Sequence, residues 1–183
     1  PKSMQTIGEC AFEGCTSLTD IALPSNLQTI GYDIFRRCIS LTDITLPANL
    51  QTIGPGAFYH CSRLTSLVFP ESLQTIDERA FCGCTSLNDI TLPANLQHIG
   101  ANAFRDCISL ASLVIPESLQ TICYLAFEGC TSLKSIKLPD NLQTIGRDAF
   151  GGCSNLRLIV CKNPAYFDWE RIGVKTSKTH IIS

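Results

Sequence analysis

The chain has 183 residues, of which 45% are hydrophobic and 16% charged, and its formal net charge at pH 7 is −2. This length is enough to bury a substantial single core. The balanced charge gives no basic face of the kind that nucleic acids or anionic membranes require, so we expect no nucleic-acid partner. No apolar stretch approaches the roughly 18 residues of a spanning helix, so we expect no membrane insertion in this segment.

An internal repeat runs through most of the chain with a constant step of 23 residues. Each unit contains a phenylalanine, a cysteine three residues later and a leucine three residues after that, and all units but the last have a proline after six more. The phenylalanines are Phe12, Phe35, Phe58, Phe81, Phe104, Phe127 and Phe150, and the cysteines are Cys15, Cys38, Cys61, Cys84, Cys107, Cys130 and Cys153. Because such units bury their apolar edges only when stacked, the repeat predicts a solenoid.

One unit illustrates the expected local structure. Ile21 and Leu23 alternate with polar or small residues, which is the pattern of a half-buried strand that ends at Pro24. A second short extended or tight-turn segment ends at Gly31, which suits a sharp bend or a positive φ. The segment from Ile34 to Cys38 has the spacing of about one turn of short helix. The sequence therefore predicts an α/β, right-handed solenoid of about seven repeats, with a parallel sheet on one face and short helices or turns on the other.

The repeat pattern LxxIxLPxxLQTIGxxAFxxC resembles the BspA-like, or treponemal, class of bacterial leucine-rich repeats over residues 1–161. The resemblance implies a leucine-rich-repeat solenoid that binds proteins. Members of this class look like surface or secreted proteins that adhere to host proteins or other cells, and other bacterial leucine-rich-repeat proteins act inside host cells as effectors. No motif defines the binding residues of the class.

The two ends of the chain depart from the repeat. Residues 1–8 align with the middle of a unit, so we expect a truncated solenoid over 1–161 with further repeats or another domain upstream. Residues 162–183 lose the pattern and contain Trp169, the single tryptophan. We expect this segment to be a C-terminal cap whose aromatic residues cover the last turn; the alternative is a partner-docking tail that ends in Ile181 and Ile182.

The repeated cysteines offer three interpretations. In a stack they would form a column about 4.8 Å apart with parallel Cα–Cβ vectors, whereas disulfides and tetrahedral zinc sites need converging side chains. We therefore expect free, buried thiols, no metal and no cofactor. Cys82 aligns with Glu13 and Tyr59, so we expect it to be an exposed, reactive thiol.

No catalytic motif is evident. The histidines, at positions 60, 98 and 180, have no nucleophile or carboxylate at a fixed offset, and we expect them to be solvated surface residues. An invariant glutamine in every unit forms a ladder whose stacked amides could bond to one another along its axis. We interpret this uniformity as structural or as the result of recent duplication.

The outward positions of the predicted sheet vary from repeat to repeat, and they are the candidate binding face. The N-terminal part is acidic, the C-terminal part is basic, and small residues lie between them. The candidate residues are Asp20, Asp43, Thr45, Val68, Asp89, Thr91, Val114, Lys134, Lys137 and Arg157. Such polarity could orient a complementary protein; alternatively, this face is a solvated surface that keeps the rod soluble.

These observations favour a non-enzymatic protein-interaction module on the bacterial surface or in secreted form, which binds a host or cell-surface protein through the sheet face. The first alternative is a leucine-rich-repeat effector or regulatory module in the cytoplasm, including that of a host cell, where reduced thiols persist. The second alternative is the non-catalytic part of a larger enzyme.

Overall fold

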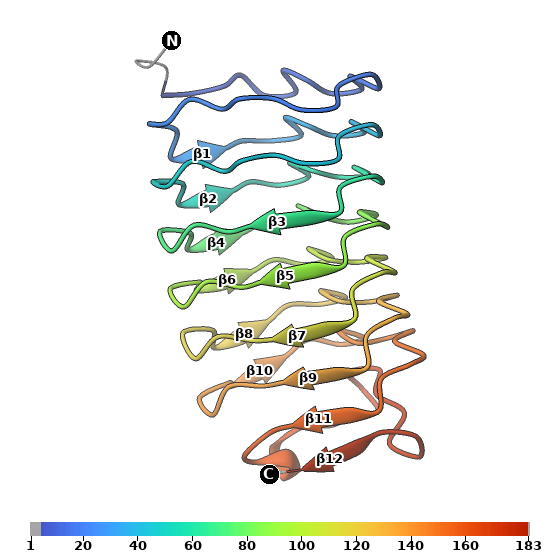
Figure 1. Cartoon of the computed structure of the whole chain (residues 1–183). Coiled ribbons are helices and arrows are strands. Elements are labelled where there is room, and N and C mark those ends of the chain that lie inside the picture. The colour runs from blue at the N-terminus through green and yellow to red at the C-terminus, as the bar shows by residue number, and fades with distance from the viewer. Residues whose placement is uncertain (1–4, 183) are drawn as a thin grey trace.

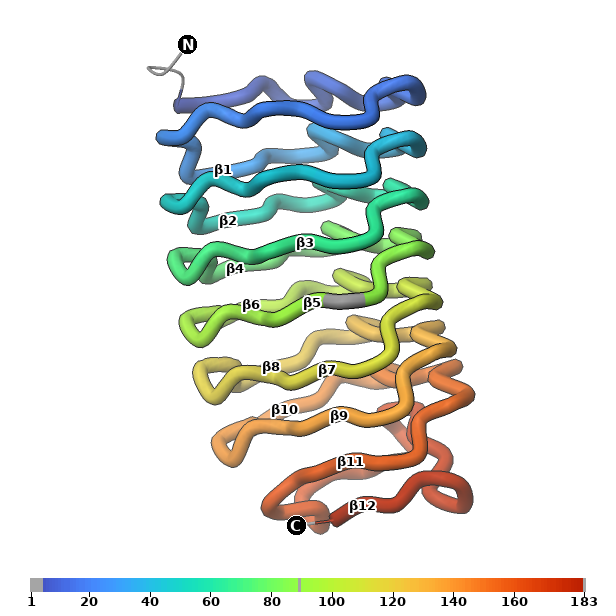
Figure 2. Tube along the Cα trace, in the orientation of Figure 1, coloured from blue at the N-terminus to red at the C-terminus, as the bar shows by residue number. Residues whose placement is uncertain are grey.

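The structure is a computed structural model, and it describes residues 5–182 with the exception of the Asp89 side chain. The chain winds as a right-handed coil of about seven turns with almost no helix, and each turn lies directly beneath the one before it (Figures 1 and 2). The predicted stacking of 23-residue units is confirmed, because strand residues pair with their equivalents 23 positions along the chain, as Thr29 does with Thr52.

Two sets of short parallel strands line the coil. The rear sheet has the order β1-β2-β4-β6-β8-β10, with β1 at Thr29–Ile30, β2 at Thr52–Ile53, β4 at Thr75–Ile76, β6 at His98–Ile99, β8 at Thr121–Ile122 and β10 at Thr144–Ile145. These pairs are the second extended segment of each repeat. Their threonine or histidine is at least partly accessible to solvent, and their isoleucine is buried.

The face sheet carries the predicted binding positions and is divided into sections. Its strands are β3 at Ser66–Val68, β5 at Asp89–Thr91, β7 at Ser112–Val114, β9 at Ser135–Lys137, β11 at Leu158–Val160 and β12 at His180–Ile182. β3 pairs with β5, and β7, β9, β11 and β12 form a second section. In the first two turns a single bridge joins Ala22 to Thr45. The continuous sheet that the sequence pattern indicates is therefore interrupted twice.

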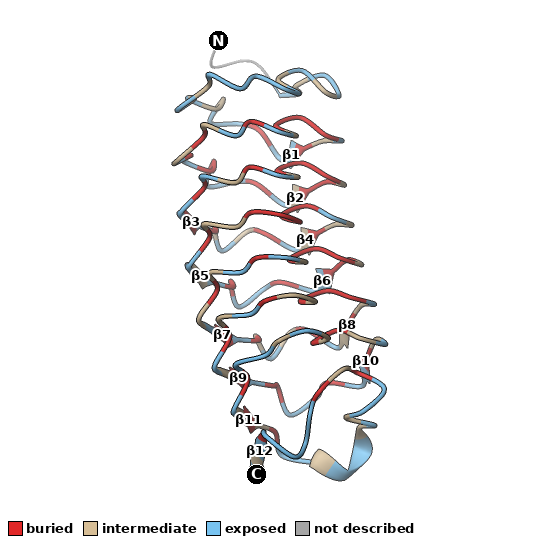
Figure 3. Cartoon of the chain, turned by 90° about the vertical axis from the view of Figure 1, so that its right-hand side faces the viewer, coloured by how far each residue is buried: buried red, intermediate tan, exposed pale blue. Residues whose placement is uncertain are grey.

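The core lies between the two sheets and is organised in columns of identical residues. Buried segments of the chain recur from one turn to the next (Figure 3). The phenylalanine rings from Phe12 to Phe150 stack nearly parallel, with centroids of successive rings 5.2–5.6 Å apart. This spacing lies within the range of about 4.5–7 Å in which aromatic pairs attract one another. Phe35, Phe58, Phe81, Phe104, Phe127 and Phe150 are completely buried.

The short helix predicted around Ile34–Cys38 is wrong: the segment forms two successive turns. Asp33 and Arg37 have φ values of 51° and 58°, in the left-handed region that a helix excludes. The left-handed residues turn alternate amides along the coil axis, so that Phe35 N donates to Ala57 O at 2.8 Å and Arg37 N donates to Tyr59 O at 2.7 Å. Amides that a helix would use internally therefore join one turn to the next.

The cysteine column adds a second set of bonds between turns. The Sγ of Cys61 donates to Phe35 O at 3.0 Å, and the Sγ of Cys84 donates to Phe58 O at 3.1 Å. The prediction of buried, free thiols is confirmed for Cys38, Cys61, Cys84, Cys107 and Cys130, whereas Cys153 is half-buried and Cys15, in the first turn, is exposed. Burial raises the pKa of the Cys38 thiol to about 11 and that of Cys84 well above its ordinary value.

Of the two conformations expected at Gly31, the positive φ is wrong, because the left-handed residues lie elsewhere in the turn. At the equivalent Gly100 the reason for glycine is close approach to the previous turn. A Cβ there would lie 2.5 Å from Glu78 N, whereas the nearest atom to a Cβ at Gly31 is Ile34 Cδ1 at 3.7 Å.

The C-terminal segment continues the coil in an altered register. β12 pairs with β11 at an offset of 22 residues, as Leu158 with His180, where the preceding pair has Leu158 with Ser135. Ile172 and Val174 are buried against the last full turn, and Trp169 is half-buried with its Nε1 donating to Pro164 O at 3.0 Å. A short 3-10 helix, η1 at Pro164–Tyr166, precedes Trp169. The segment thus covers the edge of β11.

The two glycines provide a matched pair for a stability test. We expect Gly100→Ala to lower the free energy of unfolding by about 1–3 kcal/mol, because a backbone atom must shift to admit the methyl group. Gly31→Ala should change it by less than about 0.5 kcal/mol, since the added methyl group would make only an ordinary van der Waals contact with Ile34. Urea denaturation followed by far-UV circular dichroism would measure both, and equal effects would contradict the close approach at Gly100.

The thiol column predicts a fall in stability at alkaline pH. Unfolded thiols ionise near pH 9, whereas the buried Cys84 keeps its proton to higher pH because burial raises its folded-state pKa. The stabilisation is therefore fully present below about pH 9 and is lost as the pH rises, by about 1.4 kcal/mol per pH unit for each such thiol. The unfolding free energy of the wild type should fall between pH 9.5 and 10.5 more steeply than that of Cys84→Ala by about this amount. Identical slopes in urea denaturation would exclude this contribution from Cys84.

Candidate functional site

The candidate residues on the face sheet project outward because successive residues of a strand point to opposite sides. In β3, Leu67 is buried in the core while Ser66 and Val68 are exposed. The side chains of Asp20, Asp43, Thr45, Val68, Thr91, Val114, Lys134, Lys137 and Arg157 are all exposed. The backbone of Asp89 pairs with that of Ser66, and its side chain lies outside the described part of the chain.

Two valines are the most exposed apolar groups of this surface. Val68 in β3 is 85% exposed and Val114 in β7 is 63% exposed. They occupy the same position of the repeat two turns apart, and each starts one section of the face sheet. Isolated apolar residues are common on protein surfaces, but here they stand in a row with small neighbours, Thr45 and Thr91.

Shallow grooves lie on the N-terminal half of this face. One, of about 800 Å³, is lined by Asp20, Asp43 and Thr45 together with the loop at Ala48 and Asn49. An adjoining groove of about 370 Å³ extends from Asp43 to Val68. The structure thus brings four of the predicted residues, Asp20, Asp43, Thr45 and Val68, to one pair of open grooves.

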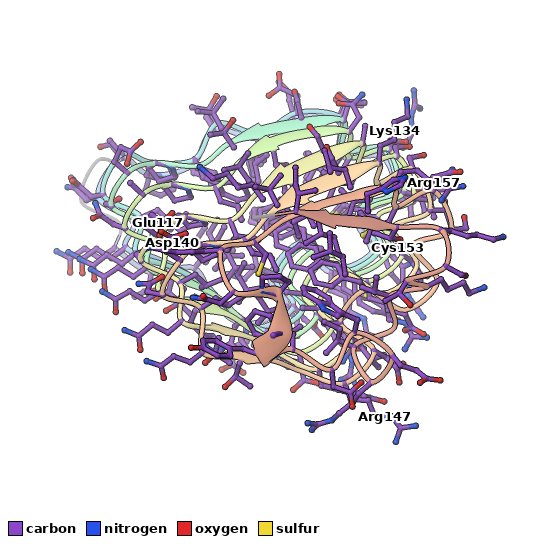
Figure 4. All side chains as sticks on the ribbon, turned by 90° about the horizontal axis from the view of Figure 1, so that it is seen from below. Glu117, Lys134, Asp140, Arg147, Cys153 and Arg157 are labelled. Atoms are coloured by element: carbon purple, nitrogen blue, oxygen red, sulfur yellow. The ribbon has the colours of Figure 1, made fainter. Side chains whose placement is uncertain are left out.

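The basic candidates lie apart from these grooves, at the C-terminal end. Lys137 pairs with Val114 on one side and Val160 on the other, and Arg157 N donates to Lys134 O at 2.9 Å. Lys134 and Arg157 project from the same edge of the coil when it is viewed from below (Figure 4). None of the ion pairs within residues 5–182 includes Lys134, Lys137 or Arg157, so no neighbouring carboxylate neutralises these three cations.

The glutamine ladder is exposed, and its amides do not bond to one another in the described part of the chain. The turns are joined instead through the glutamine backbone, as by Gln51 N donating to Gln28 O at 2.8 Å. This correction leaves the glutamine side chains free on a surface next to the rear sheet.

The expectation for Cys82 is wrong, because its side chain is only 7% exposed. Cys82 is shorter than Tyr59 and Arg105, its counterparts in the adjacent turns. Burial raises its pKa to about 11, with a further rise from the Asp106 carboxylate and an opposing effect of Arg105. The thiol is therefore protonated at neutral pH and not activated as a nucleophile.

The histidines are exposed, as expected. Across residues 5–182, no three His, Cys, Asp or Glu side chains are grouped so that they could hold a metal ion. The described residues also include no helix with the length and apolar character needed to span a bilayer.

A small pocket that the repeat pattern does not predict lies between the last full turn and the C-terminal segment. It is lined by Cys153 and Arg157 from the former and by Lys175, Lys178 and Thr179 from the latter. Lys175 and Lys178 can be read from the sequence, but their proximity to Arg157 results from the way the C-terminal segment folds back onto the last full turn.

The family comparison agrees with this architecture. The family model described as BspA type Leucine rich repeat region matches residues 1–111 and 51–168 in six copies. No curated protein sequence matches the chain.

Solved structures that are similar to this chain include other bacterial leucine-rich repeat proteins. The leucine-rich repeat protein of T. pallidum is 40% identical with a TM-score of 0.79, and the match covers 82% of this chain and 70% of that one. A leucine-rich repeat protein from Bacteroides ovatus is 29% identical with a TM-score of 0.60, over 99% of this chain and 58% of that one. The pneumococcal vaccine antigen PcpA shares the fold at 20% identity and a TM-score of 0.66, over 90% of this chain and 39% of that one. The chain belongs to the BspA-type leucine-rich-repeat family of bacterial proteins.

Proposed function

We propose that this protein is a non-catalytic module that binds another protein through the N-terminal half of its face sheet. The observation that carries the proposal is the exposure of Val68 beside open grooves whose rim bears Asp43 and Thr45. An apolar group surrounded by small and charged residues resembles the centre and rim of a protein interface. The buried thiols and the solvated histidines supply no nucleophile or general base to these grooves.

The polarity of the face supports a partner of defined charge. Asp20 and Asp43 line the grooves without a neighbouring cation in the described ion pairs, and Lys137 lies several turns further along the same face. A partner with a basic segment over the grooves and an acidic segment toward Lys137 would bind in one direction only, since the reverse orientation places like charges together.

A location on the bacterial surface or outside the cell is part of the same proposal. Membership of the BspA-type family supports this part of the proposal. The likeness to PcpA concerns the fold alone. The partner in this proposal is a host or cell-surface protein. An intracellular effector remains the second candidate, because the column of reduced thiols persists in a reducing compartment.

Charge reversal at the grooves tests the proposal. We expect the triple variant Asp43→Lys, Thr45→Lys and Val68→Lys to capture the partner at least tenfold less well than the wild type, a loss of about 1.4 kcal/mol or more. The measurement is capture from a host cell-surface extract by immobilised protein, quantified by mass spectrometry for the proteins that the wild type retains.

The control introduces three lysines on the surface next to the rear sheet, as Gln51→Lys, Gln74→Lys and Gln97→Lys, at positions that belong to the same turns or adjacent ones. Circular dichroism should show both variants folded. A loss of capture that is equal in the two variants, or absent from the first, would place the interface elsewhere.

A further inference from the structure

The small pocket at the C-terminal end arises where the repeat stops. The phenylalanine column ends at Phe150, and the residue 23 positions further is Gly173, which has no ring to continue the stack. A Cβ at Gly173 would lie 2.5 Å from Gly151 N, so the close approach of the two segments excludes a larger residue there. A pocket of about 100 Å³ remains, with Phe150, Leu156 and Val174 among its lining residues. This is roughly the space of three water molecules at about 30 Å³ each.

An unused backbone donor lines this pocket. In the preceding turns the equivalent amide donates to the next turn: Gly129 N bonds to Gly151 O at 2.8 Å, and Asp106 N bonds to Glu128 O at 2.7 Å. Gly152 has the same left-handed conformation, with φ of 71°, but its N–H has no acceptor among the described residues. Gly152 is exposed, so this N–H is open to water or to an acceptor that a ligand brings into the pocket.

Three cations surround the same space, namely Arg157, Lys175 and Lys178. The Nη1 of Arg157 donates to Ser154 O at 2.9 Å and to Leu156 O at 3.1 Å, which holds the guanidinium beside the pocket and leaves its Nε and Nη2 for another acceptor. The two lysines form no ion pair within residues 5–182.

Among the described residues, no carboxylate lines the pocket to neutralise this charge. Glu117 and Asp140 lie on the opposite side of the coil from Cys153 and Arg157 (Figure 4). Glu128, whose charge acts on Cys153, is bound by Arg105 at 2.8 Å. Burial raises the pKa of the Cys153 thiol to about 12, so the thiol stays neutral at physiological pH.

We propose that this pocket binds a tetrahedral oxyanion, a phosphate or sulfate group, between the Gly152 amide and the side chains of Arg157, Lys175 and Lys178. The amide and the guanidinium supply directed donors, the lysines supply charge, and the apolar floor weakens screening by solvent. The oxyanion takes the place of the carbonyl that a further regular turn would present to Gly152. The site is independent of the grooves near Val68, so either one can fail without the other.

The test is titration of the 15N-labelled protein with inorganic phosphate and, separately, with sulfate, followed by amide chemical shifts. The Gly152 resonance should move and saturate at millimolar anion, whereas Gly129, whose amide is already bonded to Gly151 O, should not. Sodium chloride at matched ionic strength controls for screening. Saturation with either anion supports the site, and the lower half-saturation identifies the preferred one. A Gly152 shift no larger than that in chloride would overturn the proposal.

A matched pair of double variants separates the pocket from general charge. Lys175→Ala with Lys178→Ala should raise the half-saturating anion concentration at least fivefold. Arg147→Ala with Lys162→Ala removes two cations from the same end of the coil, where they pair with Asp148 and Asp140, and should leave the titration unchanged. Equal weakening by the two double variants would show that the anion responds only to net charge and would overturn the site.

Discussion

The structure depends on one constraint: every turn must present its backbone donors and acceptors in register with the turn that follows. The left-handed residues on either side of each phenylalanine achieve this, because they rotate alternate amides out of the turn and along the axis. The phenylalanine carbonyl then accepts a bond from an amide within its own turn and another from the cysteine thiol of the next. The aromatic column and the thiol column are therefore consequences of the same register.

A thiol suits the position of the cysteine better than a hydroxyl group or a methyl group. The site is buried, so a hydroxyl would lose more hydration than a thiol, while alanine would leave both space and an unused carbonyl lone pair. The hydrogen bond that each Sγ makes to a phenylalanine carbonyl, at 3.0–3.3 Å in the buried turns, satisfies the thiol at little cost. Burial also keeps these thiols protonated, which explains how a chain with eleven cysteines can carry most of them as inert core residues.

The sequence predicts the periodic part of the molecule and fails where periodicity gives no information. The alternation that begins around Ile21 forms regular strands only from β3 onward and a single bridge at Ala22 in the first turn, whereas the repeat of Phe35 locates a core residue directly. The spacing of Phe35 and Cys38 is compatible with both a helical turn and two consecutive tight turns, and Asp33 and Arg37 do not mark a left-handed conformation by themselves, so the pattern wrongly favours a helix there. The pocket beside Gly152 could not be predicted at all, since it results from the loss of the repeat and from a register shift of one residue between β11 and β12.

The backbone and the face share a longer period of 46 residues, or two turns. The glycines that end the second segment at positions 54, 100 and 146 lie against the previous turn, where a Cβ would come within 2.4–3.0 Å of a backbone atom, whereas positions 77 and 123 carry Asp and Cys. On the face, Val68 and Val114 are separated by the same 46 residues, with threonines at the alternate positions 45 and 91. Both features follow if the chain was built by copying a block of two turns. In each block, the glycine of one turn lies against the backbone of the previous turn, whereas the equivalent position of the other turn has room for a side chain. The copying also fixes the geometry of the binding face: its exposed valines recur about 10 Å apart, at twice the strand spacing. A partner that engages both valines must therefore present apolar groups at that interval, a spacing set by the packing of the backbone.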